Sequence, residues 1–185
     1  MAHTFPVENA ARLEDADRFR FCSPEELVGL VGEGADRVAD LGSGTGFYSR
    51  EVAPHVGTLV GLDVQAGMHR LHREHGLGAN VRLVTTEVDC LALADDSLDA
   101  AVSTMTFHEF CTPEGLAEIA RVLRPGGRFA NVDWSAEGPG EDGPSREDRQ
   151  TAASAAELAR EAGFEVERAE ERVETFVLLA RAPSA

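Results

Sequence analysis

The sequence predicts an α/β protein built on a doubly wound sheet of seven strands, mostly parallel, with an antiparallel last strand. Short apolar runs alternate with helical patterns along most of the 185 residues, which is typical of a parallel sheet with helices on both faces. Only residues 172–174 separate the last two apolar runs, too few for a crossover connection, so these two strands are expected to pair antiparallel. A glycine-rich turn follows the first run, as at the strand ends of many such sheets.

The expected strands are residues 37–41, 58–63, 81–86, 99–104, 128–133, 165–171 and 175–181. Residues 36–185 would form this domain, and residues 1–35 an N-terminal helical cap segment, in which Ser23 is placed to cap a helix that begins at Pro24. The helix of residues 151–162 is expected to end at Gly163. Residues 135–145, rich in Gly and Pro, should form a loop, either a mobile lid or a linker.

The loop after the first strand reads Asp-Leu-Gly-Ser-Gly-Thr-Gly-Phe from Asp40 to Phe47. Glycine has no Cβ, so alternating glycines predict a backbone that lies against a cofactor, although a simple tight turn would have the same composition. A dinucleotide-binding loop has its third glycine three residues after the second, where this chain has Phe47. With Asp40 in front, the loop suits a ligand that carries an ammonium or sulfonium group and no phosphate. A nicotinamide-dependent oxidoreductase is therefore disfavoured.

This loop resembles that of the class I S-adenosylmethionine-dependent methyltransferases, in particular the small Ubi/Coq5-like enzymes. The resemblance extends to residues 84–103, which begin at the end of the third strand, and to residues 119–133, which read as a helix, a Pro-Gly-Gly turn and a strand. It implies a Rossmann-like fold with S-adenosyl-L-methionine as the cofactor. It also implies that the N-terminal helical segment lies over the active site.

The resemblance assigns roles to acidic residues at the ends of strands. Asp63 ends the second strand, 17 residues after Gly46, where a carboxylate binds the ribose hydroxyls; the simpler alternative is that Asp63 caps the next helix. Glu87 is preferred as the contact of the adenine amino group, and Asp89 is the competing position. The cofactor-binding residues expected in this way are Asp40, Gly42, Ser43, Gly44, Gly46, Asp63, Val64, Glu87, Val88 and Thr104.

Catalysis would require few residues, because methyl transfer from a sulfonium is an in-line displacement in which alignment and proton removal are the main tasks. His108 follows the fourth strand and could accept a proton, since its ordinary pKa is about 6.5. The alternative is that His108 only caps or packs beneath the next helix. His69, His72 and His75 recur at intervals of three, but the Arg and Glu residues between them favour a solvated surface over a metal site, so no metal is predicted.

These observations predict a methyltransferase that acts on a small-molecule acceptor. A non-catalytic protein of the same fold that binds S-adenosylmethionine or another nucleoside is the alternative, because the Asn/Asp-Pro-Pro-Tyr type of motif used by amino-methylating enzymes is absent after the fourth strand. An NAD-dependent oxidoreductase ranks below both. The sequence leaves open which atom of the acceptor is methylated and whether the chain forms a homodimer.

The formal charge is −16, from 33 acidic residues and 17 basic residues, and all the basic residues are arginine. Such an acidic surface repels nucleic acid, so a nucleic-acid substrate is disfavoured. The composition favours a protein of a salt-loving microbe, and an acidic protein of a high-GC genome is the alternative. With no apolar run of about 20 residues, no signal sequence and three scattered cysteines, we expect a cytoplasmic protein that does not contact a membrane.

If the charge is an adaptation to salt, the thermal midpoint of unfolding should rise as potassium chloride increases from about 0.1 M to above 1 M. The carboxylates then repel one another less, because the Debye length falls from about 10 Å to about 3 Å. Potassium chloride acts mainly by screening, whereas sulfate would also strengthen hydrophobic burial. A midpoint that stays constant or falls at constant pH would contradict the salt adaptation.

Overall fold

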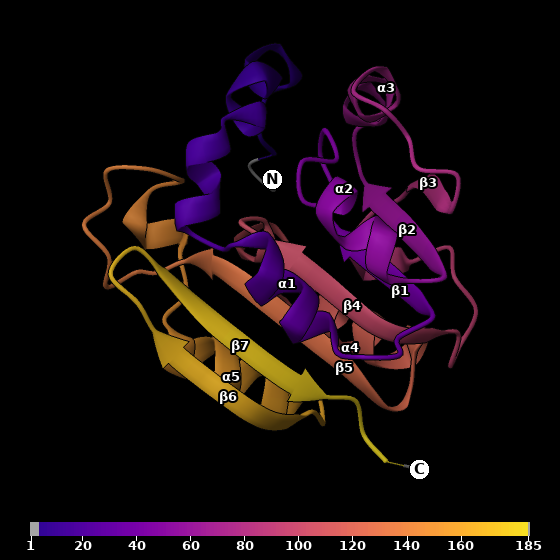
Figure 1. Cartoon of the computed structure of the whole chain (residues 1–185). Coiled ribbons are helices and arrows are strands. Elements are labelled where there is room, and N and C mark those ends of the chain that lie inside the picture. The colour runs from indigo at the N-terminus through magenta and orange to yellow at the C-terminus, as the bar shows by residue number, and fades with distance from the viewer. Residues whose placement is uncertain (1–3, 185) are drawn as a thin grey trace.

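A computed structural model describes residues 4–184, in which seven strands form one sheet of order β3-β2-β1-β4-β5-β7-β6 (Figure 1). The neighbouring strands from β3 to β5 are parallel, and β7 pairs antiparallel with both β5 and β6. The predicted fold, with its reversed last strand, is therefore confirmed. The strands are β1 (Arg37–Leu41), β2 (Thr58–Asp63), β3 (Val81–Thr85), β4 (Leu98–Thr104), β5 (Leu123–Trp134), β6 (Glu165–Glu171) and β7 (Thr175–Arg181).

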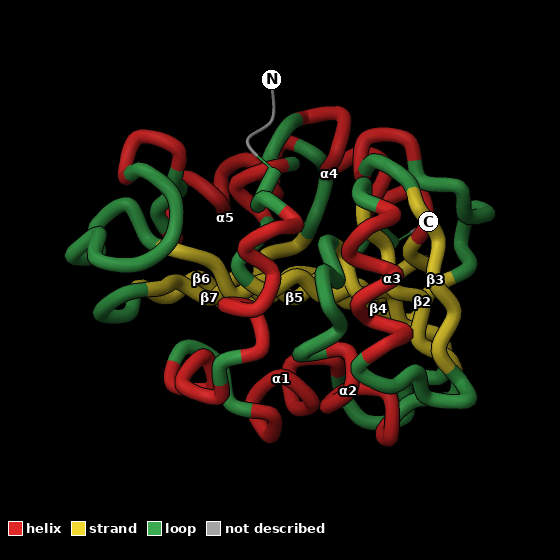
Figure 2. The backbone as a smooth tube through the Cα atoms, turned by 90° about the horizontal axis from the view of Figure 1, so that it is seen from above, coloured by secondary structure: helices red, strands yellow, loops and turns green. Residues whose placement is uncertain are grey.

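Helices cover both faces of the sheet (Figure 2). One face packs on α1 and α2, and the other on α4 and α5, so that two apolar clusters form, one on each side. The α-helices are α1 (Pro24–Val31), α2 (Ser49–Val52), α3 (Ala66–Glu74), α4 (Pro113–Val122) and α5 (Ala152–Glu161). The 3-10 helices are η1 (Val7–Glu14), η2 (Ala16–Arg20), η3 (Ala53–His55), η4 (Val88–Cys90), η5 (Phe107–Glu109) and η6 (Arg146–Asp148). Among the described residues, no helix combines the length and apolar character that a membrane span requires.

Local sequence explains where the main helices begin and end. The Ser23 side chain accepts a hydrogen bond from the Glu26 N–H at the start of α1, as its position before Pro24 predicts. At the start of α5, Thr151 and Ser154 form a reciprocal capping box. The helix ends just before Gly163, whose φ of +88° suits glycine.

The strand order places the carboxyl ends of β1, β2, β4 and β5 at one edge of the sheet. The chain goes from β1 outward to β2 and β3 and then returns to β4 on the other side of β1. Ligands of such open sheets bind at this reversal, outside the carboxyl ends of the strands. The edge carries Asp40, Asp63, Thr104 and Asp133 at or next to these strand ends.

The N-terminal segment of residues 4–20, which we call the cover, crosses this carboxyl edge. In Figure 2 the chain runs from the side of α4 and α5, over the sheet, to α1 on the other side. The cover consists mainly of η1 and η2. A long chain segment therefore lies directly above the strand ends where a ligand is expected.

The segment after β5, expected to be a mobile lid or a linker, is a loop with its own internal contacts. The buried Arg149 side chain donates hydrogen bonds to the carbonyl oxygens of Pro144, Asp142 and Ser135, and its guanidinium lies 5.7 Å from the centre of the Trp134 ring. Charge-assisted hydrogen bonds from one guanidinium to several backbone carbonyls stabilise this shape of the loop. Arg20 of the cover also pairs with Asp142 of this loop at 2.7 Å, so the two segments are joined.

Candidate functional site

The glycine loop after β1 has the backbone that only glycine adopts readily. Gly42, Gly44 and Gly46 have φ angles of +71°, +52° and +82°. A Cβ would lie 2.3 Å from the Thr106 side chain if placed at Gly42, and 2.2 Å from the His72 ring if placed at Gly46. At Gly44 it would meet only Leu13 of the cover, at 3.5 Å. Gly42 and Gly46 are thus required by packing, whereas Gly44 faces the space beneath the cover.

Asp63 joins the end of β2 to this loop. Its Oδ2 accepts a hydrogen bond from the Gly44 N–H at 2.9 Å, and its Oδ1 accepts one from the Gln65 N–H at 2.8 Å. Burial raises the pKa of Asp63, while these two N–H groups lower it in part. The carboxylate lies at the strand end where a ribose ligand is expected, and it also holds the turn that leads into α3.

Asp40 lies beneath the loop, only 2% exposed. The Ser49 hydroxyl, at the start of α2, donates a hydrogen bond to its Oδ2. Burial raises the pKa of Asp40 to about 6, the Ser49 bond lowers it, and the charge of Asp63 raises it further. Asp40 therefore helps to hold α2 against the loop. Its carboxyl group also lies below the space between the glycine loop and the cover, which we call the ligand space.

The remaining expected contacts lie along the same edge. Thr104 is buried at the end of β4, Val64 is 41% exposed after β2, and Val88 is partly buried in η4. Glu87 and Asp89, the two alternatives for the adenine contact, are both exposed, Glu87 directly before η4 and Asp89 within it. The geometry favours neither of them, so the choice between Glu87 and Asp89 stays open.

His108 and Asp133 form a hydrogen-bonded pair at the ends of β4 and β5. The His108 Nδ1 lies 3.0 Å from Asp133 Oδ2, and the His108 backbone N–H donates to the same oxygen at 2.7 Å. Asp133 is 1% exposed and also accepts the Trp134 N–H at 2.8 Å. Burial lowers the pKa of His108, but the hydrogen bond and charge of Asp133 outweigh this, and the net pKa is raised. With Nδ1 held by the carboxylate, Nε2 is the nitrogen that can accept a proton.

The edge as a whole is acidic, which suits a cationic ligand. Glu109 lies next to His108, and burial raises its pKa to about 7, with Asp63 and Asp133 adding to the shift and His108 opposing it. An ammonium or sulfonium group beside these carboxylates would lower their pKa values and relieve their mutual repulsion. The open backbone at Gly44 and these acidic side chains therefore fit S-adenosylmethionine, whose methionine end carries both cations.

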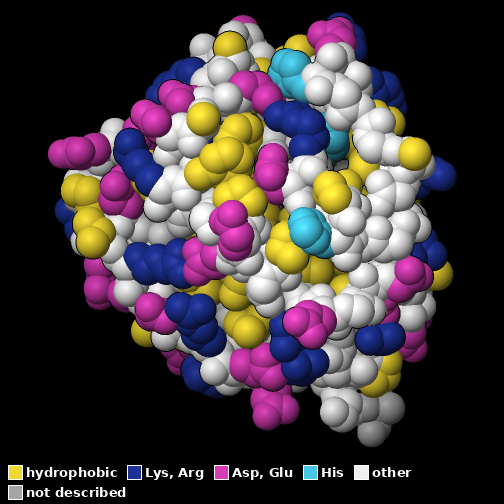
Figure 3. All heavy atoms as spheres, in the orientation of Figure 1, with side chains coloured by type: hydrophobic (Ala, Val, Ile, Leu, Met, Phe, Trp, Pro, Cys, Tyr) yellow, Lys and Arg dark blue, Asp and Glu magenta, His cyan; other side chains and the backbone are white. Residues whose placement is uncertain are grey.

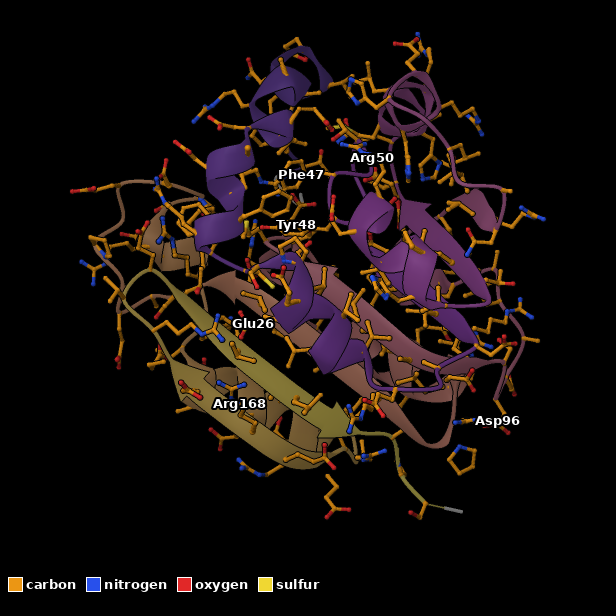
Figure 4. The ribbon with its side chains drawn as sticks, in the orientation of Figure 1. Glu26, Phe47, Tyr48, Arg50, Asp96 and Arg168 are labelled. Atoms are coloured by element: carbon orange, nitrogen blue, oxygen red, sulfur yellow. The ribbon has the colours of Figure 1, made fainter. Side chains whose placement is uncertain are left out.

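Glu14 attaches the cover to the glycine loop and to α2. Its carboxylate accepts a hydrogen bond from the Thr45 hydroxyl, pairs with Arg50 of α2, and lies 3.2 Å from the His75 Nδ1. Figure 4 shows Phe47, Tyr48 and Arg50 at the junction of loop and α2, near the cover. A part-buried cluster of charged hydrogen bonds thus fastens the cover above the ligand space.

Of the three histidines expected on a solvated surface, His75 is exposed at the end of α3, whereas His69 and His72 are buried. His69 is 2% exposed and His72 is fully buried, and the His69 Nδ1 lies 3.1 Å from the Thr85 hydroxyl. Burial lowers the pKa of His72 to about 4, because its ring packs against Gly46. Within residues 4–184, no group of three or more His, Cys, Asp or Glu side chains is arranged to hold a metal ion.

Sequence reasoning missed three polar residues that the fold brings to the site. Asp133 ends a strand in the same way as Asp40 and Asp63, so the rule that identified those two acids would also have found it. Glu14 and Arg18 gave no such signal, because they reach the loop only through the path of the cover. Their roles depend on contacts between residues about 30 positions apart in the sequence.

The fold and the site together are those of the class I S-adenosylmethionine-dependent methyltransferases. Residues 38–127 match the family described as a methyltransferase domain. A solved structure described as a SAM-dependent methyltransferase from Aquifex aeolicus superposes with a TM-score of 0.87 at 28% identity, covering 97% of this chain and 100% of that one. The cofactor of this family is S-adenosylmethionine, as the loop predicted.

Curated relatives match over a shorter range. A malonyl-[acyl-carrier protein] O-methyltransferase of Methylococcus capsulatus is 39% identical over 56% of this chain and 40% of its own length. A demethylmenaquinone methyltransferase of Corynebacterium kroppenstedtii is 37% identical over 54% of this chain and 42% of its own length. The matched region thus spans less than half the length of these two relatives.

We predict that Asp63→Ala weakens S-adenosylmethionine binding by roughly 1.5 to 3 kcal/mol. The variant loses charge-assisted hydrogen bonds to the ribose and also releases the Gly44 N–H. Titration calorimetry measures the dissociation constant, with Glu165→Ala, at the exposed start of β6, as the control that should bind as the wild type does. An unchanged constant for a folded Asp63→Ala variant would exclude Asp63 as a ribose ligand.

Proposed function

We propose that this chain transfers the methyl group of S-adenosylmethionine to a small-molecule acceptor, with His108 as the general base. The observation that carries the proposal is the His108–Asp133 pair at the same sheet edge as the glycine loop and Asp63. A binding protein without acceptor chemistry has no need for a histidine whose Nδ1 is fixed by a buried carboxylate. The same arrangement orients the base in many enzymes that remove a proton.

In this mechanism the cofactor supplies an activated methyl group on its sulfonium when it is bound. The chain's own residues do the rest. The loop and Asp63 fix the position of the methyl group, the cover excludes water from above, and the His108 Nε2 accepts the proton that the acceptor loses. Asp133 keeps the proton of the resting imidazole on Nδ1 and stabilises the imidazolium that forms.

The acceptor is expected to be small and to carry a removable proton, such as that of a hydroxyl, an ammonium or an acidic C–H group. The segment between β5 and α5 is compact around Arg149, which leaves little room for a large acceptor domain. The names of the two relatives, which refer to a malonyl-acyl carrier and a demethylmenaquinone, support acceptors of this size. Arg and acidic side chains are intermixed on the face shown in Figure 3, which has no continuous basic surface for nucleic acid.

The alternative, a protein of the same fold that binds the nucleoside without catalysis, predicts no turnover with any acceptor. It predicts as well that the His108–Asp133 pair serves only to attach η5 to β5. Formation of S-adenosylhomocysteine in the presence of a panel of phenols, quinols, amines and carboxylic acids separates the two functions. We also expect the chain to work in the cytoplasm, and its three cysteines, which are all free, support a reducing compartment.

We predict that the rate of acceptor-dependent S-adenosylhomocysteine formation rises with pH through a pKa above about 6.5. His108 must be neutral to accept a proton, and its pKa is raised, so the base form gains population only above that value. His108→Gln should remove this limb of the pH profile and lower kcat by about 10²- to 10⁴-fold. Asp133→Asn removes the negative charge that raises the pKa of His108 and leaves only a neutral acceptor, so the rise of the rate should move to lower pH while kcat falls.

A structural role for His108 would give a different result. His108→Gln would then lower the thermal midpoint but leave the pH profile of the remaining activity unchanged. Glu157→Gln, on α5 away from the strand ends, is the matched control and should behave as the wild type does in both measurements. An unaltered kcat in a folded His108→Gln variant would contradict the assignment of His108 as the base.

A further inference from the structure

Arg18 of the cover is held by residues on both sides of the ligand space. Its guanidinium carbon lies 5.1 Å from the ring centres of both Phe47 and Tyr48, which directly follow the glycine loop. One Nη donates to the Leu13 carbonyl at 2.6 Å, and the other lies 3.7 Å from the Met105 sulfur, just beyond the end of β4. The Tyr48 hydroxyl donates to the Arg18 carbonyl at 2.8 Å, so the backbone is fixed as well.

Most N–H groups of the Arg18 guanidinium donate no hydrogen bond to an oxygen of the described residues, and no carboxylate of these residues pairs with it. Among the ion pairs of residues 4–184, none includes Arg18, whereas most of the other part-buried arginines pair with a carboxylate. Of its five N–H groups, only one donates to an oxygen of the described residues. Burial lowers the pKa of Arg18, and the nearby charges of Tyr48, Glu14 and Asp40 oppose this. A part-buried cation without a partner is costly, and a carboxylate that received its free N–H fork would relieve that cost.

The neighbours of Arg18 indicate which part of the cofactor it meets. It touches residues 47, 48 and 105, at the ends of the glycine loop and of β4, and none of the residues assigned to the ribose or the adenine. The methionine end of S-adenosylmethionine is the part expected at this loop. That end carries two cations, which the acidic edge attracts. It also carries one carboxylate, which the acidic edge repels and which therefore needs a cationic partner.

We propose that Arg18 binds the α-carboxylate of S-adenosylmethionine, an inference that rests on the proposed function. The two ends of the ligand space are then complementary to the zwitterionic methionine group, with carboxylates below it and one guanidinium above. Because Arg18 belongs to the cover, the contact also makes closure of the cover part of cofactor binding. A ligand without the carboxylate would leave Arg18 unpaired and the cover less firmly held.

The test compares S-adenosylmethionine with decarboxylated S-adenosylmethionine, which keeps both cations and lacks only the carboxylate. Dissociation constants of both are measured by calorimetry for the wild type, Arg18→Gln and Arg18→Lys. We expect the wild type to prefer S-adenosylmethionine by about 10- to 100-fold, as for a charged bidentate contact. Arg18→Gln should abolish this preference by weakening only the carboxylate-bearing ligand, and Arg18→Lys should keep part of it.

Arg20→Gln is the matched control, because Arg20 lies on the same 3-10 helix but pairs with Asp142 and Glu174 outside the ligand space. It should keep the full preference of the wild type. Equal weakening of both ligands by Arg18→Gln would overturn the proposal and leave Arg18 as a packing residue. Unchanged S-adenosylmethionine binding with a raised KM for a carboxylate-bearing acceptor would also overturn it. If neither ligand binds the wild type, the proposed function itself fails, which is a distinguishable result.

Discussion

The hydrogen bond from the Gly44 N–H to the Asp63 carboxylate is the contact on which the site depends. It joins the loop after β1 to the end of β2, and the positive φ of Gly44 is a backbone conformation that glycine adopts readily. Bonds from an N–H to a charged acceptor contribute roughly 1.5 to 3 kcal/mol, enough to select one conformation of a short loop. That conformation sets the positions of Phe47 and Tyr48. Their rings in turn contact the Arg18 guanidinium.

The second constraint is the concentration of negative charge at one edge of the sheet. Asp40, Asp63, Glu109 and Asp133 lie at or beyond four strand ends, and burial raises the pKa values of Asp40 to about 6 and of Glu109 to about 7. Without a cation nearby, burial favours the protonated forms of Asp40 and Glu109. A cation in the site reverses the preference, because it favours the charged form of each carboxyl group. The acidic edge therefore favours the binding of a cation, and this binding should be accompanied by a measurable release of protons.

The sequence predicted what is local or periodic. The seven strands, the reversed last strand and the glycine loop follow from apolar runs, glycine spacing and the short connection at residues 172–174, and the structure confirms them. The burial of His69 and His72 was not predictable, because the helical pattern gives no sign that their face is covered by the glycine loop. The same holds for Glu14 and Arg18, whose partners are fixed only when the cover crosses the sheet edge. Asp133, by contrast, could have been predicted, because it lies at the end of a strand as Asp40 and Asp63 do.

The most direct test of the account is a calorimetric titration of the full chain with S-adenosylmethionine and with NAD near pH 6.5. Measuring in two buffers of different ionisation heat gives the number of protons exchanged. We expect S-adenosylmethionine to bind with net proton release, because its cations lower the pKa values of Glu109 and Asp40, and we expect NAD not to compete. Binding of S-adenosylmethionine without proton release, or displacement of it by NAD, would contradict the account.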